Sequence, residues 1–389
     1  MKEEITMPTK PEFLSPRDGD VLNDRDGVRR DGALYVPVRF APISDGEITV
    51  MGVPAVQDGD ALTLEVPLYG YRNSVTAHNT ATGEETRITL VYLPQMEKVY
   101  RLSSDDNILF LAELNADPER YKSIFDHPYL AVYREAHERY GAKVHLNLFY
   151  ETDDVALSLF SADRPYFNLS MMSDRYKDEF RQNADWLRLA FHSRSEFPPS
   201  PYRDADFMTV LRDTATVNRE IIRFAGEECL GNTTTVHYGA ANREGIRALR
   251  ALGYRSLTGY FIRDRHGRPS VAYYVDGELL DHIEGRDAFY DTAEDILFAR
   301  IDTVLNLRTN AENLQILRET VADPHRGGLI SVMIHEQYFY SDYKNHLSDF
   351  RARVLDACAY LYEAGYRGTH LTELFQEPDL KKHPSIALH

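Results

Sequence analysis

The segment Arg101-Leu-Ser-Ser-Asp-Asp-Asn-Ile-Leu109 places two adjacent carboxylates, Asp105 and Asp106, directly after the mainly apolar residues 99–102. If residues 99–102 form a buried strand, both acids lie at its C-terminal end, where open α/β folds and barrels carry their active sites. Two neighbouring carboxylates repel each other unless a metal ion or a shared proton offsets their charge. The alternative is that the pair begins a helix, as its N-cap and first-turn acids.

The residues after 100 have the pattern of alternating strands and helices. Strands are expected over residues 143–150, 186–191, 233–237 and 328–334. Helices are expected over residues 129–140, 173–184, 205–225, 242–252, 311–321 and 343–364. Repeated βα units of this length predict a parallel sheet or barrel with its site at the strand C-termini. A hairpin is also expected over residues 270–280, because Asp276-Gly277 separates two apolar runs.

Residues 11–96 have the pattern of a small all-β domain. Short β-rich runs at 34–40, 48–51, 62–66 and 86–92 are separated by turn signals such as Asp45-Gly46. This spacing predicts a small immunoglobulin-like sandwich. The segments Leu14-Ser-Pro-Arg-Asp-Gly-Asp-Val21 and Val66-Pro-Leu-Tyr-Gly-Tyr-Arg-Asn73 resemble the bacterial immunoglobulin-like (Ig-like) modules that are attached to carbohydrate-active enzymes. Residues 1–10 are polar and patternless, so a loose tail is expected there.

The composition is that of an ordinary globular protein with a strong negative charge. Of the 389 residues, 43% are hydrophobic and 27% are charged, and the formal net charge is -17. That charge repels nucleic acid and anionic membranes, so neither is expected as a partner. No apolar stretch approaches the roughly 20 residues that span a bilayer, and residues 1–8 lack the apolar core of a signal peptide. A cytoplasmic location is therefore expected.

The ends of four expected strands carry metal-ligand side chains, namely Asp105 with Asp106, His192 with Glu196, His237, and His335. Imidazole and carboxylate groups together suit Zn²⁺ or another divalent first-row metal. The two cysteines are not spaced as Cys-x-x-Cys, which excludes a cysteine-rich metal site. Each member also has a structural alternative. A histidine at a strand end is commonly a hydrogen-bonded structural residue, and Glu196 can simply be solvated in the proline-rich loop that follows it.

Three of these motifs resemble those of the polysaccharide deacetylases, which carry the NodB-homology domain. Ser104-Asp-Asp106 resembles the family's Thr-Phe-Asp-Asp motif, His192-Ser-Arg-Ser-Glu196 its His-Ser/Thr-x-x-His metal motif, and Met333-Ile-His335 its Leu-x-His motif. The resemblance covers residues 99–374 and implies a distorted (β/α) barrel of about seven strands over residues 97–389. It further implies that acetyl groups are removed from a sugar with the help of a divalent metal.

The resemblance assigns a role to each matched residue. It implies that Asp105 is the general base, Asp106 and His192 are metal ligands, and His335 is the general acid that protonates the leaving group. Such roles agree with the chemistry of metal-assisted hydrolysis, in which the ion acidifies water while a carboxylate accepts its proton. An acetylated oligosaccharide or polysaccharide is then the expected partner.

The sequence also departs from the family at two places. Glu196 replaces the second metal histidine, and the segment 234–239 stands where the family has an Arg-x-Pro motif, so its base-orienting arginine is unaccounted for. His237 is a candidate for the missing imidazole ligand, with Glu196 as a further ligand. Two alternatives stay open: a carbohydrate-binding pseudoenzyme with a degenerate site, and a glycosidase with paired acids on a related barrel.

Aromatic residues near the expected acid are candidates for a sugar platform. Tyr338, Tyr340 and Tyr343 follow His335 closely, and Tyr202 follows the proline-rich loop. Aromatic faces pack against the C–H surfaces of sugars, so these four tyrosines are candidate substrate-binding residues. The alternative is that they pack in the core.

Overall fold

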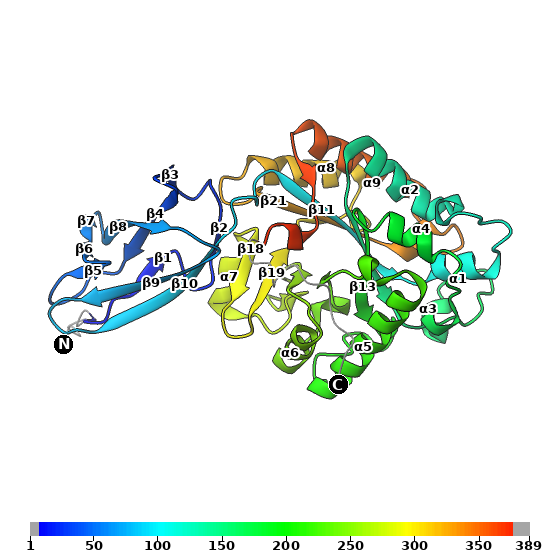
Figure 1. The fold of residues 1–389 in the computed structure, drawn as a ribbon, viewed down its shortest axis with the longest axis horizontal. Helices are drawn as coiled ribbons and strands as arrows, with labels where there is room; N and C mark the ends of the chain where they lie inside the picture. Colours follow the sequence, from blue (N-terminus) through cyan, green and yellow to red (C-terminus); the bar gives the residue numbers. More distant parts are fainter. Residues whose placement is uncertain (1–7, 376–389) are drawn as a thin grey trace. The chain divides into compact units, whose positions relative to one another are not determined.

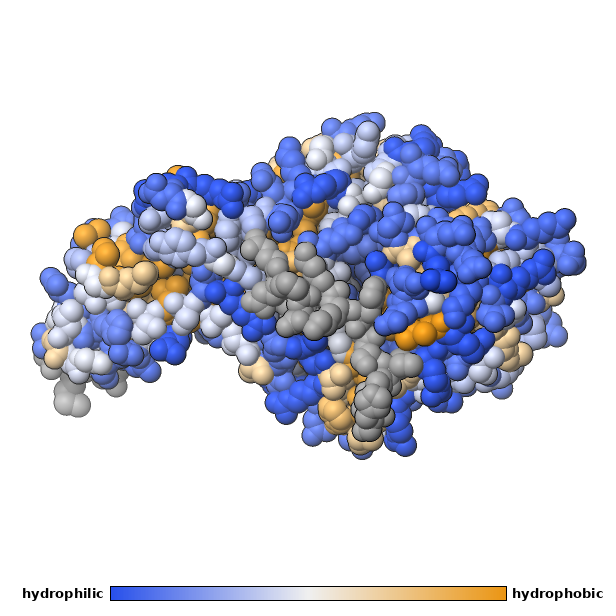
Figure 2. Space-filling view, viewed as in Figure 1, coloured by the Kyte–Doolittle hydropathy of each residue, from blue (hydrophilic) through white to orange (hydrophobic). Residues whose placement is uncertain are grey.

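The computed structural model describes residues 8–375, which form two compact units. Within that range the first unit comprises residues 8–97 together with 288–293, and the second comprises 98–287 and 294–375. Residues 1–7 of the expected tail and residues 376–389 of the expected barrel domain lie outside the described residues. No helix in the described range is long and apolar enough to cross a membrane. The face in Figure 2 is mainly hydrophilic, with hydrophobic residues exposed in small groups.

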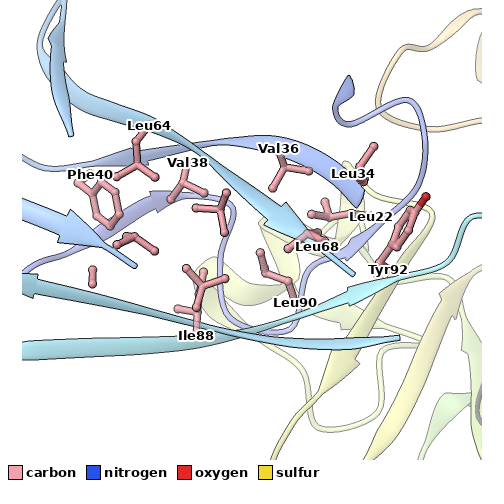
Figure 3. Close-up of a cluster of buried hydrophobic side chains, with 14 of the residues drawn as sticks. Leu22, Leu34, Val36, Val38, Phe40, Leu64, Leu68, Ile88, Leu90 and Tyr92 are labelled. Carbon is pink, nitrogen blue, oxygen red and sulfur yellow. The ribbon is translucent and has the colours of Figure 1, made fainter. Parts of the chain in front are cut away.

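The N-terminal unit consists of two five-stranded sheets that share one hydrophobic core (Figure 3). One sheet has the order β1-β4-β8-β7 with β3 paired to β4, and the other has the order β2-β10-β9-β5-β6. The strands are β1 (Phe13–Ser15), β2 (Val21–Leu22), β3 (Val28–Arg30), β4 (Ala33–Phe40), β5 (Ile48–Val50), β6 (Val53–Pro54), β7 (Val56–Asp58), β8 (Ala61–Leu68), β9 (Arg72–Asn79) and β10 (Glu85–Tyr92). Val36, Val38 and Phe40 are buried at every second position of β4 and pack in one core with Ile88 and Leu90 of β10. This arrangement is a two-sheet sandwich, while its immunoglobulin-like character stays a prediction.

Strand β18 (Ala288–Asp291) belongs to the same unit although it lies far along the chain. Phe289 forms an antiparallel bridge with Asp20, and the backbone N–H of Tyr290 donates to the carbonyl of Gly19 over 2.8 Å. A Cβ atom at position 19 would lie 2.2 Å from the Tyr290 carbonyl oxygen, so this approach requires glycine. The sequence pattern gave no sign of this excursion.

The second unit contains a six-stranded sheet of order β13-β12-β11-β21-β20, in which β22 also pairs with β11. Figure 1 labels three of its strands, β11, β13 and β21. Its strands are β11 (Val99–Asn107), β12 (Val144–Phe149), β13 (Leu187–Ser193), β20 (Thr303–Val304), β21 (Leu329–His335) and β22 (Arg367–Gly368). All of these strands pair in parallel. Every residue of β11 and β12 is buried, as in parallel sheets covered on both faces. Parallel pairing places the C-terminal ends of β11, β13 and β21 at one edge.

A second parallel ladder joins β14 (Thr233–Thr234), β15 (Ser256–Gly259) and β19 (Ile296–Arg300) in that order. Leu189 of β13 makes a parallel bridge with Leu230, just before β14, and β19 leads into β20 of the larger sheet. The expected mixture of strands and helices with parallel pairing is therefore confirmed. The ladders among the described strands form separate sheets, however, and do not show a closed barrel.

Helices connect these strands, and their ends follow local side-chain chemistry. They are α1 (Leu109–Ala116), α2 (Pro128–Tyr140), α3 (Asp154–Leu157), α4 (Lys177–Gln182), α5 (Phe207–Phe224), α6 (Arg243–Ala251), α7 (Gly277–Glu284), α8 (Asn310–Ala322) and α9 (Phe350–Glu363). The side chain of Asp206 accepts the N–H of Thr209 at the start of α5, and Gly141, with φ of 63°, ends α2. Helix α9 begins later than expected because the preceding residues form turns, with the N–H of Tyr343 donating to the carbonyl of Tyr340 over 3.0 Å.

The hairpin expected over residues 270–280 is wrong. The side chain of Asp276 accepts the N–H of Gly277 and caps α7, while β17 (Pro269–Ser270) pairs antiparallel with β16 (Ile262–Arg263). An Asp-Gly pair suits either a tight turn or a helix N-terminus. The helix-forming residues 278–280 that follow favour the helix.

Asp105 and Asp106 lie within β11, so the interpretation of the pair as a helix cap is wrong. Helix α1 begins only at Leu109. The register between β11 and β12 is irregular from Ser104 to Asn107, and Asp106 has a φ of 62°. Adjacent residues of a regular strand point to opposite faces. The irregularity accounts for the finding that both carboxylates line one cavity.

Candidate metal centre and active site

A cavity of about 310 Å³ lies at the C-terminal edge of the parallel strands. It is lined by the strand-end residues Asp105, Asp106, His192, His237 and His335, and by Glu196. Four strands far apart in the sequence thus deliver these side chains to one place, as parallel pairing predicts.

Asp106, His192 and His237 form a buried cluster of metal-ligand atoms. Asp106 Oδ1 lies 3.0 Å from His192 Nε2 and 3.4 Å from His237 Nδ1. The two ring nitrogens lie 3.1 Å apart. The three residues are only 7%, 2% and 4% exposed, in that order, so water cannot screen the group well.

Two backbone carbonyls fix the tautomers of both histidines. The carbonyl oxygen of Thr235 lies 2.5 Å from His192 Nδ1, and that of Glu196 lies 3.0 Å from His237 Nε2. A carbonyl oxygen only accepts hydrogen bonds, so these two ring nitrogens must carry protons and donate them. When neutral, the two rings therefore direct their lone pairs, at His192 Nε2 and His237 Nδ1, toward Asp106.

Three atoms whose lone pairs converge in a buried site repel one another unless a cation or a proton lies between them. Their separations resemble the ligand spacing around a tetrahedral ion, since bonds of about 2.0–2.1 Å place ligand atoms about 3.3 Å apart. Metal-bound histidines commonly donate their second N–H to a backbone carbonyl, as both rings do here. The residues therefore fit a divalent ion such as Zn²⁺.

The electrostatics of the cluster agree with this fit. Burial acts to raise the pKa of Asp106, but His335, His192 and His237 outweigh it and hold the pKa well below its usual range. Burial acts to lower the pKa of His192, but Asp105 and Asp106 raise it above its usual value. The cluster thus attracts positive charge, and Gln337 Nε2 donates to the second oxygen of Asp106 over 2.8 Å.

Asp105 stands beside this cluster with its own support. Asn147 Nδ2 donates to Asp105 Oδ1 over 2.6 Å. Arg101, on the same strand, is fully buried and donates from Nη1 to Ser103 Oγ over 2.8 Å. Burial lowers the pKa of Arg101 to about 10, although the charge of Asp105 opposes that shift. Arg101 therefore supplies a buried positive charge that attracts the carboxylate of Asp105.

His335 presents one defined nitrogen to the cavity. Asn306 Oδ1 lies 3.1 Å from the backbone nitrogen of His335 and 2.8 Å from its Nδ1. The backbone N–H must donate, so the Asn306 atom is an acceptor and the ring Nδ1 must donate to it as well. Nε2 is then the atom that gains or loses a proton, and it lies 3.9 Å from Asp106 Oδ2. The side chain is 23% exposed, which leaves it accessible from the cavity.

Glu336, the neighbour of His335, anchors the start of α1. Its carboxylate accepts the N–H groups of Ile108, Leu109 and Phe110 over 2.7, 2.9 and 2.6 Å. Burial raises the pKa of Glu336 to about 7, although these N–H groups act in the opposite direction. A single side chain therefore ties the segment that follows Asp105 and Asp106 to the strand that carries His335.

The carboxyl group of Glu196 lines the cavity but is not part of the ligand cluster found among the described residues. Its contribution to that cluster is the backbone carbonyl that orients His237. Burial, with the charges of Asp106 and Asp153, raises the pKa of Glu196 to about 9.

The four candidate platform tyrosines separate into two pairs. Tyr338 and Tyr343 line the cavity. Tyr340 and Tyr202 do not, because each is buried with its hydroxyl donating elsewhere, to Glu336 over 2.9 Å and to Asp213 over 3.0 Å. Tyr238 also lines the cavity and is 49% exposed.

Several supporting residues carried no recognisable sequence signal. Asn147, Asn306 and the carbonyl of Thr235 act across strands, so their roles depend on register and not on local pattern. Tyr238 directly follows the candidate ligand His237 in the sequence, and this position could have identified it as a residue of the site.

Comparisons with known proteins give distant likenesses only. No family model matches the chain, and no curated protein matches it. A wild-type CE4 family pseudoenzyme from Bacillus anthracis is similar over 72% of this chain and 65% of its own length, with 12% identity and a TM-score of 0.34. Two mutants of it, one of them with restored enzymatic activity, are similar over 75% of this chain and 76% of theirs, with the same identity and TM-score.

Proposed function

We propose that this protein is a metal-dependent hydrolase that removes acetyl groups from an N- or O-acetylated carbohydrate. The proposal includes a polysaccharide-deacetylase-like (β/α) barrel as the catalytic domain and an Ig-like module before it. The observation that carries it is the convergence of three lone pairs, from Asp106, His192 and His237, beside a separate carboxylate and a separate imidazole. Those are the parts that metal-assisted hydrolysis needs.

Asp106, His192 and His237 would hold the ion, and Zn²⁺ suits this donor set. When bound, such an ion acidifies a water molecule and polarises the acyl carbonyl. The two carbonyl-fixed tautomers keep the ligand lone pairs pointing inward, so little reorganisation is needed.

Two further side chains move the protons. Asp105, held by Asn147, accepts a proton from the attacking water. His335 donates a proton from Nε2 to the departing nitrogen or oxygen, because its Nδ1 proton is committed to Asn306. Tyr338 and Tyr343 border the cavity where a sugar ring can pack against their faces.

The proposal is tested by metal content and acetate release. The purified protein should contain close to one equivalent of zinc and release acetate from N-acetylated chito-oligosaccharides or acetylated xylo-oligosaccharides. Asp105→Asn should retain zinc and lose acetate release by about 10²-fold or more, the share of a general base. His192→Ala should lose the zinc itself.

Exposed residues of the same types serve as matched controls. Asp178→Asn and His325→Ala alter exposed side chains and should leave both measurements unchanged. A folded protein without zinc affinity would contradict the proposal. Zinc and glycan binding without any acetate release would instead favour a carbohydrate-binding protein with a degenerate site.

A further inference from the structure

A second cavity adjoins the cluster of Asp106, His192 and His237, and the proposed acetyl hydrolysis does not use it. It has a volume of about 40 Å³ and shares Asp106, Glu196, Gln337 and Tyr343 with the larger cavity. The two cavities therefore meet beside a proposed metal ligand.

The walls of this second cavity are mainly apolar. Ile108 at the start of α1, Phe149 at the end of β12, and Ala156, Leu157 and Phe160 in and after α3 line it. The ring of Phe149 lies 5.2 Å from that of His192 and 5.1 Å from that of His237, measured between centroids. The apolar surface thus begins directly against the two histidines.

Two acidic residues of the wall, Asp153 and Glu151, already have partners. Asp153 accepts the N–H of Ala156 over 2.8 Å and the N–H of Phe197 over 3.2 Å. Glu151 pairs with Arg194 over 2.8 Å and accepts the hydroxyl of Tyr166 over 2.8 Å. With these groups engaged, the surface left for a ligand is mainly hydrocarbon, and Glu196 and Gln337 lie on the side shared with the larger cavity. The wall includes no lysine or arginine among the described residues, so an anion would find no countercharge there.

We propose that this cavity receives the alkyl end of the acyl group, so that the site hydrolyses acyl groups longer than acetyl. The inference rests on the proposed hydrolase function. A volume of about 40 Å³ holds about three water-sized groups. A butyryl group, with three carbons beyond its carbonyl, matches that size.

The reaction is an ordinary hydrolysis. The oxygen of water forms a bond to the acyl carbon, and the bond from that carbon to the sugar nitrogen or oxygen breaks. Asp105 accepts the proton lost by the water, and His335 supplies the proton gained by the leaving group. The products are a short-chain carboxylic acid and the free amine or alcohol of the sugar.

The test compares acyl groups on one carrier. Chitobiose bearing N-acetyl, N-propionyl, N-butyryl or N-hexanoyl groups is hydrolysed by the zinc-loaded protein, and kcat/KM is measured for each. We expect kcat/KM to rise by about four-fold for each added methylene up to butyryl, because each methylene leaves water. Hexanoyl exceeds the cavity and should be hydrolysed more slowly than butyryl.

Substitutions in the wall should change this preference. Ala156→Phe fills the cavity and should lower the butyryl-to-acetyl ratio of kcat/KM by about ten-fold or more. Leu157→Ala enlarges the cavity and should move the optimum toward hexanoyl. Val155→Ala is the matched control, because Val155 is 53% exposed and does not line the cavity.

Binding of the free acids separates this inference from the function on which it rests. Sodium butyrate should raise the Tm of the zinc-loaded protein more than sodium acetate at the same concentration. Acetate release with butyryl substrates rejected would overturn the acyl-chain inference alone. A butyrate-specific rise in Tm without turnover of any acyl substrate would overturn the hydrolase and keep the alkyl cavity. Neither turnover nor a butyrate effect would overturn both.

Discussion

The chemistry of His335 depends on one amide oxygen. Asn306 Oδ1 accepts both the backbone N–H and the ring Nδ1–H of that residue. This double contact determines which ring nitrogen faces the cavity. An isolated neutral histidine divides its population between two tautomers, whereas the contact with Asn306 keeps a proton on Nδ1, so the imidazolium form can donate its other proton from Nε2 into the cavity.

Replacing that oxygen should therefore impair turnover more than binding. We expect Asn306→Leu to lower kcat by about 10²-fold, within the range that general acid catalysis contributes. Asn306→Asp, which keeps an acceptor for the Nδ1 proton, should retain far more activity than the leucine variant. Steady-state kinetics on an acetylated oligosaccharide gives both values. Equal losses in the two variants would exclude a role in fixing the tautomer.

At this scale the sequence indicated the ligands better than their supports. His237 was a candidate for a missing imidazole, and the structure brings its Nδ1 to the cluster. Glu196 was expected as a ligand from its spacing to His192, and this stays a prediction; its backbone carbonyl, which the spacing did not indicate, accepts from His237. The spacing of two residues along the chain does not show whether the side-chain oxygen or the backbone carbonyl of a residue reaches the site, because both belong to the same residue.

The element that most depends on a distant residue is helix α1. Its N-cap residue, Ile108, offers no side-chain acceptor. Glu336 replaces a local cap by accepting three N–H groups of the first turn. When ionised, this carboxylate also lies favourably at the positive end of the helix dipole.

Glu336→Gln should destabilise the protein measurably above neutral pH, where the Glu336 carboxyl group is ionised. One amide oxygen cannot replace two carboxylate oxygens, and the new NH₂ group faces donors, so at least one buried N–H loses its acceptor. We expect the free energy of unfolding in urea to fall by about 1–3 kcal/mol. Glu363→Gln, at an exposed glutamate near the end of α9, is the matched control. An unchanged unfolding midpoint in Glu336→Gln would contradict this account.

The type of an element was predictable where the hydrophobic periodicity was strong. It was not predictable where one dipeptide suits both a tight turn and a helix start. The buried strands β11, β12 and β21 were recognisable from apolar runs. The Asp276-Gly277 pair was misread because a turn and a helix cap draw on the same residues. The register irregularity near Asp106 left no trace in the sequence, since it arises from pairing with β12.

Buried acids couple the stability of the protein to pH. Burial raises the pKa of Asp287 to about 7, with Asp302 adding to the effect, and burial raises that of Glu336 to about 7. Asp287 accepts the N–H groups of Gly327, Gly328 and Leu329, so it holds the start of β21. Both ends of this strand are therefore tied by carboxyl groups that resist ionisation.

Stability should consequently fall as the pH rises through neutrality. A folded-state pKa above the unfolded value means that the folded protein binds the proton more tightly. That stabilisation is complete below the unfolded pKa and is lost as pH rises through about 7. Each group can contribute a slope of up to about 1.4 kcal/mol per pH unit between about pH 5 and 7. Urea unfolding from about pH 5 to 8 measures this slope, and Asp287→Asn should flatten it. A slope of opposite sign would contradict the prediction.

The division of the chain was only partly accessible from sequence. A change from β-rich to alternating pattern marks the region near residue 97, where the first unit ends. Residues 288–293 return to that unit without any local sign, because β18 resembles any other short strand. Contacts between segments remote in sequence arise only after both have folded.

The adjacency of His335 and Glu336 also bears on the fidelity of folding. The side chain of His335 faces an accessible cavity, whereas that of Glu336 contacts the buried start of α1. If β21 paired with β11 one residue out of register, the carboxylate would turn into the cavity and the imidazole would be left against three N–H donors. Such an error would lose the anchor of α1 and the proton donor at once. A misaligned strand would therefore be unstable as well as inactive, and a stably folded population should hold the acid in its working position.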